Sequence, residues 1–298
     1  MEIIDAQFHE PASPKPLPDD WTADARRLLN VELAREALDC VGVDKAIAFA
    51  DQPYIDACVE RYPERFAGVL TFDHTAADLE EQIATYRDTP GNLAGRNSVG
   101  NADTAELRPE FAAGAYDRYW ELAERYELPL FFSTHGWPSV MEVVAQRHPG
   151  MTIIIDHLGL SQSPVSPPRA DPWDALDGLL ALARYPNVYV KLCGVALLSR
   201  EPAPHRDAWP HLHRVFDAFG PERIMWASDY TRMRWLPSFE AGPDVRYTAG
   251  DEPTLAPFKQ WTYYSDCLNY LRDTDELSTS DKEWVLGRTV RRALRWES

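Results

Sequence analysis

The sequence predicts a (β/α)8 barrel formed by a single domain over residues 1–298. Short β-rich apolar runs alternate eight times with longer helical patterns along the chain. Several runs, such as AIAF, PLFF and MTIII, are apolar throughout, which is typical of a parallel sheet covered on both faces. The alternation is also compatible with an open doubly wound sheet, but eight strand–helix units favour closure into a distorted barrel of the TIM type.

The expected strands follow one another at short intervals. They span residues 2–8, 45–50, 66–72, 93–99, 129–134, 151–156, 187–194 and 223–228. Helical patterns cover residues 31–41, 53–62, 77–87, 112–126, 138–148, 173–185, 208–219 and 285–296. Two long loops, a Ser/Pro segment after the sixth strand and an irregular stretch over 230–258, follow the carboxyl ends of strands, where a barrel builds its site.

Composition restricts the classes of function. The net charge of −17, from 30 basic and 47 acidic residues, argues against nucleic acid and against an anionic membrane as partners. A small anionic substrate remains open, because a local cluster of basic side chains can override the global field. The four cysteines form no CxxC pair, and no apolar run reaches the roughly 18 residues of a membrane span. Since the first segment, MEIIDAQFHE, resembles a strand rather than a signal peptide, we expect a cytoplasmic protein with reduced thiols.

Four ionisable residues stand directly after strands. His9, His135, His157 and Asp229 follow the first, fifth, sixth and eighth expected strands. Because the carboxyl ends of barrel strands meet at one rim, these side chains are expected to converge. Imidazole and carboxylate together suit Zn²⁺, and also Mn²⁺ or Fe²⁺, with an open position for an activated water. The same residues could act without metal, with aspartate as a general base and histidine as an acid or carbonyl polariser.

Several segments also carry a resemblance to a known family. IIDAQFHE, FFSTHGWP, IIIDHLG, NVYVKLCG and RIMWASDY resemble the amidohydrolase superfamily, and within it the amidohydrolase-2 group. That group includes 2-pyrone-4,6-dicarboxylate hydrolase, related lactonases and metal-dependent nonoxidative decarboxylases. The resemblance extends over essentially the whole chain, although Arg288-Thr289 stands where the family's last Gly-Asn-Ala element is usual.

The resemblance implies roles for the strand-end residues. The family's first strand ends in His-x-His, whose two histidines bind metal, whereas this chain has Gln7-x-His9. His9, His135 and Asp229 remain as implied ligands of one divalent ion, and Gln7 either supplies a fourth contact or fills the gap. An amide oxygen is a weaker ligand for Zn²⁺ than imidazole. The resemblance further implies that His157 faces the substrate and Asp229 activates water. Metal-independent catalysis, as in some hydrolases of the group, is therefore also open.

Two further aspartates are placed by the alternation of side chains along a strand. Asp5 shares its parity with Gln7 and His9, so we expect it to point into the bottom of the barrel. Asp156 has the opposite parity to His157, and we expect it to face the helix layer. The expected fourth strand contains no lysine that could bridge two metals, which argues against a binuclear site.

Candidate substrate-binding residues flank the strand-end group. Arg96, near the end of the fourth strand, and Lys191, within the seventh, could each bind a substrate carboxylate or instead form a buried ion pair. Trp137, Tyr230 and Arg232 could form a pocket wall, although scattered aromatic residues are more often part of the packing. The aromatic content is compatible with a homodimer.

The function that these residues favour is hydrolysis. Water would be added to a lactone or similar carbonyl substrate, a small molecule that bears a carboxylate. A metal-dependent nonoxidative decarboxylase of an aromatic or unsaturated acid is an alternative that uses the same residues. A noncatalytic barrel that binds a ligand is a third, against which the joint presence of His135, His157 and Asp229 argues.

Overall fold

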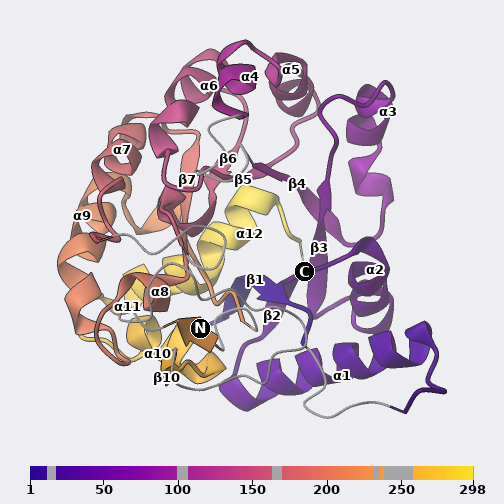
Figure 1. Ribbon diagram of the computed structural model, residues 1–298, viewed down its shortest axis with the longest axis vertical. Helices are drawn as coiled ribbons and strands as arrows, with labels where there is room; N and C mark the ends of the chain where they lie inside the picture. Colours follow the sequence, from indigo (N-terminus) through magenta and orange to yellow (C-terminus); the bar gives the residue numbers. More distant parts are fainter. Residues whose placement is uncertain (12–17, 99–106, 163–169, 231–234, 238–257, 298) are drawn as a thin grey trace.

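Eight parallel strands form a nearly closed barrel in the computed structural model, which describes residues 1–11, 18–98, 107–162, 170–230, 235–237 and 258–297. Each strand pairs with the next in sequence order (Figure 1). The strands are β1 (Ile4–His9), β2 (Lys45–Phe49), β3 (Phe66–Thr71), β4 (Asn92–Ser98), β5 (Leu130–Ser133), β6 (Ile153–Ile155), β7 (Val188–Cys193) and β8 (Ile224–Ala227). The predicted barrel and its eight strands are confirmed.

The ring is completed between its first and last strands. Beyond the end of β8, the amide of Asp229 donates to the carbonyl of Gln7 at 3.0 Å, and the amide of His9 donates to the carbonyl of Tyr230 at 2.5 Å. Phe8 and Tyr230 form a parallel bridge. The residues that follow β8 are therefore held against β1 at the rim.

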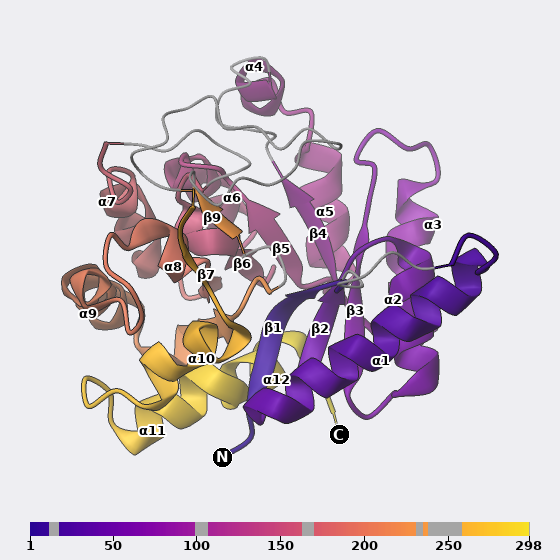
Figure 2. The ribbon, with the colours of Figure 1, turned by 60° about the horizontal axis from the view of Figure 1, so that its bottom comes forward.

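Helices surround the barrel and close its lower end. The outer helices are α1 (Ala23–Val41), α2 (Gln52–Arg61), α3 (Leu79–Ala84), α4 (Leu107–Ala112), α5 (Asp117–Arg125), α6 (Met141–Arg147), α7 (Leu176–Leu180), α8 (Val195–Leu198), α9 (Trp209–Phe219), α10 (Tyr264–Arg272) and α11 (Thr279–Glu283). In Figure 2, α12 (Thr289–Leu294) lies below the amino-terminal ends of the strands. Its Val290 and Leu294 join Ile4 in the inner core, so the bottom of the barrel is plugged with apolar side chains.

Two expectations about local structure are corrected. The first helix begins at Ala23 rather than at residue 31, because the Thr22 hydroxyl accepts a hydrogen bond from the Ala25 amide and caps the helix. The stretch over 230–258 is not irregular throughout: β9 (Trp235–Pro237) pairs antiparallel with β10 (Phe258–Trp261). Strands of three and four residues are too short to show a period in the sequence.

Strand parity separates the inner core from the outer one. Along β7, Val188, Val190 and Leu192 face the helices, whereas Lys191 and Cys193 face the barrel interior. In β1, Ala6 and Gln7 together oppose one residue of β2, because the register shifts between Asp5 and Phe8. This bulge breaks the alternation.

The prediction that Asp5 points into the barrel bottom is wrong because of that bulge. Its carboxylate instead turns toward α10 and accepts hydrogen bonds from the Ser228 amide (2.9 Å), the Ser228 hydroxyl (2.5 Å) and the Tyr264 hydroxyl (2.9 Å). Burial raises the pKa of Asp5 to about 6, although the hydrogen bonds from Ser228 act in the opposite direction. Asp5 is thus a buried link between β1, β8 and α10.

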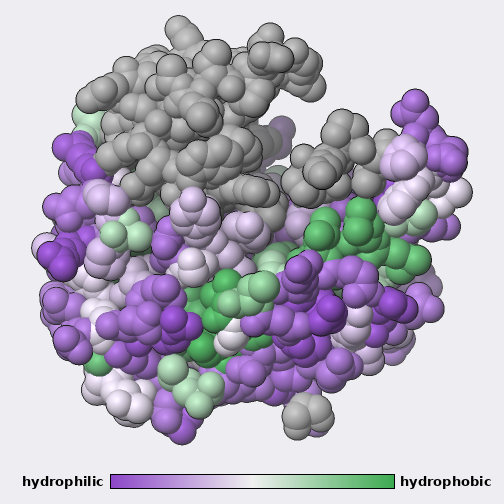
Figure 3. All heavy atoms as spheres, turned by 90° about the horizontal axis from the view of Figure 1, so that it is seen from below, coloured by the Kyte–Doolittle hydropathy of each residue, from purple (hydrophilic) through white to green (hydrophobic). Residues whose placement is uncertain are grey.

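The surface in Figure 3 is mainly hydrophilic, with a limited band of hydrophobic side chains. The large hydrophobic residues exposed in the described part of the chain are Met1, Trp21, Leu28, Val143 and Tyr263. Within the same residues, no helix combines the length and apolarity needed to cross a bilayer. A homodimer stays a prediction.

Candidate active site

Three of the predicted site residues adopt backbone conformations that are unusual for their type. His135, His157 and Asp229 have φ of 45°, 53° and 56°, and they follow β5, β6 and β8 at the rim. A positive φ is uncommon for a residue with a side chain, and such strained residues gather at functional sites. At the end of β6 the strain continues into Leu158, with φ of 57°.

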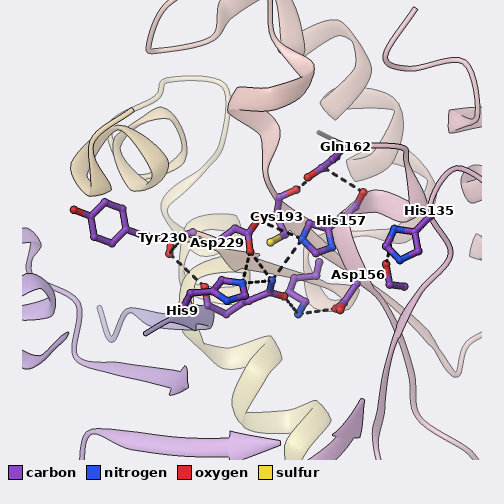
Figure 4. Close-up of polar contacts among 12 residues, drawn as sticks. His9, His135, Asp156, His157, Gln162, Cys193, Asp229 and Tyr230 are labelled. Carbon is purple, nitrogen blue, oxygen red and sulfur yellow. Dashed lines mark hydrogen bonds and ion pairs between the residues drawn. The ribbon is translucent and has the colours of Figure 1, made fainter. Parts of the chain in front are cut away.

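The carboxylate of Asp229 is the centre of a hydrogen-bonded group (Figure 4). It is fully buried, and its Oδ1 accepts hydrogen bonds from Gln7 Nε2 at 2.6 Å and His9 Nε2 at 2.8 Å. Its Oδ2 lies 3.5 Å from His157 Nε2. Gln7, His9, His157 and Asp229, from the ends of three strands, thus meet around one carboxylate.

The orientation of the Gln7 amide follows from its second partner. Lys191 Nζ lies 2.8 Å from Gln7 Oε1, and an ammonium group can only donate hydrogen bonds. The amide oxygen must therefore face Lys191, and the NH₂ group must face Asp229. Gln7 Nε2 also lies 3.2 Å from His9 Nε2 and 3.5 Å from His157 Nε2. Gln7 presents N–H donors to the site.

A buried ion pair between Lys191 and Asp156 fixes the lysine that orients the Gln7 amide. Lys191 and Asp156 are both fully buried, and Lys191 Nζ lies 2.6 Å from Asp156 Oδ1. Arg96 Nε lies 3.2 Å from Asp156 Oδ2. Burial alone would raise the pKa of Asp156, but the charges of Lys191 and Arg96 outweigh it and hold that pKa at about 2. Asp156 is therefore ionised and fixes both cations.

The prediction that Asp156 faces the helix layer is wrong. It assumed that the sixth strand continues through His157, but β6 ends at Ile155 and a 3-10 turn (Asp156–Gly159) follows. Ile154 and Asp156 lie on the same inward side, and the positive φ of His157 turns that residue inward as well.

A pocket of about 500 Å³ opens beside this group. His9 and His157 lie on its wall, together with His135 and Arg96. The other lining residues are Thr71, Asn97, Ser98, Ser133, Leu160 and Gln162. The ion pair with Asp156 uses Nε of Arg96, and the Arg96 guanidinium places a positive charge on the pocket wall. The pocket can therefore hold a small polar molecule with an anionic group.

The remaining predicted residues are placed differently. Lys191 is fully buried and does not line the pocket, so it matches the ion-pair alternative rather than direct substrate binding. The ring of Tyr230 packs against Phe8 and Tyr264, and Trp137 packs against Phe111. None of these aromatic residues lines the pocket. Arg232 lies outside the described residues.

Sequence reasoning missed several residues of the site. The polar side chains of Thr71, Asn97, Ser98 and Ser133 lie at the ends of β3, β4 and β5, so the rule that found the strand-end histidines could have found them too. Cys193 shares its parity with Lys191 in β7, which signals an inward position. Gln162 gave no signal; its Nε2 donates to the Cys193 carbonyl at 2.9 Å.

The ligand set implied by the resemblance does not fit a metal ion. A ligand must offer a lone pair, but Gln7 offers N–H groups, and its oxygen is held by Lys191. His135 lies apart from Asp229, on the far side of His157 (Figure 4). Within the described residues, the group of His, Cys, Asp or Glu side chains close enough to hold an ion is His157, Cys193 and Asp229, which contains neither His9 nor His135.

The fold and the site define a class: a (β/α)8 barrel with an aspartate–histidine centre at the carboxyl ends of its strands. Comparison with known proteins agrees. The family described as Amidohydrolase matches residues 4–296, and the chain belongs to this family. L-fucono-1,5-lactonase of Burkholderia ambifaria is 36% identical over 89 residues, which are 29% of this chain and 28% of that protein.

Two solved structures share the fold over essentially the whole length. An amidohydrolase from Burkholderia multivorans with bound zinc has a TM-score of 0.70 and 18% identity, and the match covers 100% of both chains. A candidate 2-pyrone-4,6-dicarboxylic acid hydrolase from Pseudomonas putida has a TM-score of 0.65 and 16% identity, covering 100% of this chain and 98% of that one. At these identities the likeness concerns the fold.

Proposed function

We propose that this protein hydrolyses a lactone-like carbonyl substrate that bears a carboxylate, without needing a metal for the reaction. The observation that carries the proposal is the convergence of Gln7, His9 and His157 on the buried Asp229 carboxylate beside a polar pocket. Similarity to an L-fucono-1,5-lactonase and membership of the amidohydrolase family support it.

Asp229 is suited to act on water. An ionised carboxylate held by N–H donors can accept a proton from a water molecule placed between it and the substrate. The hydroxide oxygen then bonds to the lactone carbonyl carbon. When the ring C–O bond breaks, the leaving oxygen takes up the proton, which restores the carboxylate and yields a hydroxy acid.

The NH₂ group of Gln7 is suited to polarise the carbonyl, because it carries a second N–H beside the one that bonds to Asp229. His9 Nε2 donates its single hydrogen to the Asp229 carboxylate at 2.8 Å and so holds the base in place. Donors that are fixed before the reaction stabilise the negative charge that develops on oxygen, and loss of one such donor typically lowers kcat by about 10²–10³. His157 lies within the same group and lines the pocket. Arg96 would hold the substrate carboxylate.

The test is hydrolysis by chelator-treated protein. L-fucono-1,5-lactone, other sugar lactones and 2-pyrone-4,6-dicarboxylate would be offered, and acid release followed with a pH indicator. We expect turnover of at least one lactone, and a loss of about 10²–10³ in kcat for Gln7→Leu. Absence of turnover on the whole panel, or turnover that appears only with added metal, would contradict the proposal. Decarboxylation stays the untested alternative.

A further inference from the structure

A buried thiol that the proposed hydrolysis does not use lies beside the catalytic carboxylate. Cys193 is the last residue of β7 and is fully buried, with its side chain in the inner core. Ligand atoms of Cys193, His157 and Asp229 all lie within 4.8 Å of one another. The three residues come from the carboxyl ends of three consecutive strands, β6, β7 and β8.

We infer that His157, Cys193 and Asp229 form a binding site for a thiophilic divalent cation such as Zn²⁺. Thiolate, imidazole and carboxylate are the ligand types that zinc takes in proteins, and the thiolate favours such an ion over Mg²⁺ or Ca²⁺. Three protein ligands leave a fourth tetrahedral position. This position can be reached from the pocket, because His157 lines it.

The N–H donor of Gln7, which argues against a metal among His9, His135 and Asp229, makes its short contact elsewhere. Gln7 and His9 bond to Oδ1 of Asp229 at 2.6 and 2.8 Å, whereas Gln7 Nε2 is 3.5 Å from His157 Nε2. The other carboxylate oxygen, Oδ2, is the one on the side of His157, 3.5 Å from its Nε2. A cation bound through Oδ2 therefore leaves the contacts at Oδ1 in place.

The surroundings balance charge and hold the ligands. The ammonium of Lys191, two residues from Cys193, is paired with Asp156 at 2.6 Å, which reduces its repulsion of a second cation. Gln162 Nε2 donates to the Cys193 carbonyl at 2.9 Å, so the end of β7 is fixed. His157 and Asp229 are held in their left-handed backbone conformations. On binding, the Cys193 thiol loses its proton to solvent and the sulfur bonds to the ion.

Occupation of this site would inhibit the enzyme, a consequence that rests on the proposed function. An ion bound to Asp229 and His157 occupies the general base and a histidine that lines the substrate pocket at the same time. The thiol would thus make hydrolysis sensitive to free zinc. This differs from a catalytic metal, whose removal would lower turnover rather than raise it.

Cobalt(II) substitution tests the site without any substrate. Chelator-treated full-length protein would be titrated with Co²⁺, and the sulfur-to-cobalt charge-transfer band recorded in the near ultraviolet. We expect the band in the wild type and in Cys58→Ser, a buried-thiol control on α2. We expect its loss in Cys193→Ser, with at least ~100-fold weaker Co²⁺ binding. Cys193→Ala would serve if the serine variant fails to fold, as judged by circular dichroism.

Two results would overturn the site: no Co²⁺ binding by the wild type, or Co²⁺ binding without a thiolate band. Hydrolysis is measured separately. If the band appears and turnover of a lactone falls in step with it, the inhibitory role is supported, whereas a rise in turnover would refute that role. If no lactone is hydrolysed at all, the proposed function fails, and the cobalt band still decides whether the site exists.

Discussion

The ammonium group of Lys191 has two roles: it pairs with the buried Asp156, and it orients the amide of Gln7. Replacing Lys191 by methionine tests both. The variant leaves the buried Asp156 with Arg96 as its remaining cation partner among the pairs described, and it releases the oxygen of the Gln7 amide. Removing one partner of a buried ion pair typically costs about 3–5 kcal/mol. For 298 residues the entropy of unfolding is about 0.6 kcal/mol per kelvin, so the melting temperature should fall by about 5–8 °C.

Activity should fall for a different reason. Without Lys191 the amide of Gln7 can rotate, which would place its oxygen against Asp229 and remove a donor from the carbonyl site. We expect kcat on a lactone substrate to fall by about 10- to 100-fold, somewhat less than complete loss of an oxyanion donor. Calorimetry and steady-state kinetics measure the two effects. Lys45→Met, at a partly exposed lysine of β2, is the control and should change both little.

The double variant Lys191→Met/Asp156→Asn distinguishes the effect of Lys191 on stability from its effect on activity. Replacing Asp156 as well removes the buried carboxylate that lost its Lys191 partner, and Arg96 has a side chain that is 31% exposed and can be solvated. Stability should therefore recover in large part, while kcat should remain low because Gln7 is still not oriented. A Lys191→Met melting temperature within about 1 °C of wild type would refute the energetic argument. Recovery of kcat in the double variant would refute the positioning role of Lys191.

Three further predictions concern single side chains. Asp229→Asn should lower kcat by at least ~10³ while circular dichroism stays unchanged, and wild-type turnover would exclude Asp229 as the base. Arg96→Leu should raise KM for a carboxylate-bearing lactone by about 10- to 100-fold but not for a neutral one, since charged hydrogen bonds contribute about 1.5–3 kcal/mol. The folded-state pKa of Asp5, about 6 against an ordinary 3.8, means that folded protein takes up a proton first as pH falls. The Asp5 contribution to the free energy of unfolding should thus be fully present below pH 3.8 and decline by about 3 kcal/mol as pH rises through 6, whereas Asp5→Asn should lack that slope in denaturant titrations.

The sequence allows the barrel and much of its rim to be predicted, because both depend on local pattern. Apolar runs such as PLFF and MTIII locate the strands, and two ionisable residues at the ends of the sixth and eighth strands, His157 and Asp229, lie in the site. The errors at Asp5 and Asp156 have one cause: parity counting assumes an uninterrupted strand. A bulge in β1 and an early end of β6 break that assumption, and neither leaves a mark in the residue types.

The direction of the Gln7 amide could not be predicted in the same way. It is set by Lys191, which is 184 positions away in sequence, and Lys191 in turn is set by Asp156. Taken alone, each of these residues can be explained by a structural role such as an ion pair or the filling of a gap. The role of the amide as a donor becomes visible only when β1, β6 and β7 are placed next to one another around the barrel.

The variant Gln7→His tests whether that donor is what excludes a metal from the family position. Gln7 Nε2 lies within 3.5 Å of Asp229 Oδ1, His9 Nε2 and His157 Nε2, so a lone pair in its place would face three further ligand atoms. A neutral imidazole offers such a lone pair, and the amide nitrogen does not. We therefore expect Gln7→His/Cys193→Ser to bind Co²⁺ more tightly than Cys193→Ser alone, with no thiolate band and about one ion per chain by elemental mass spectrometry. Equal metal content in the two proteins would mean that the Gln7 amide does not exclude the ion. The positive charge of Lys191, whose Nζ lies 2.8 Å from Gln7 Oε1, would then be what excludes it.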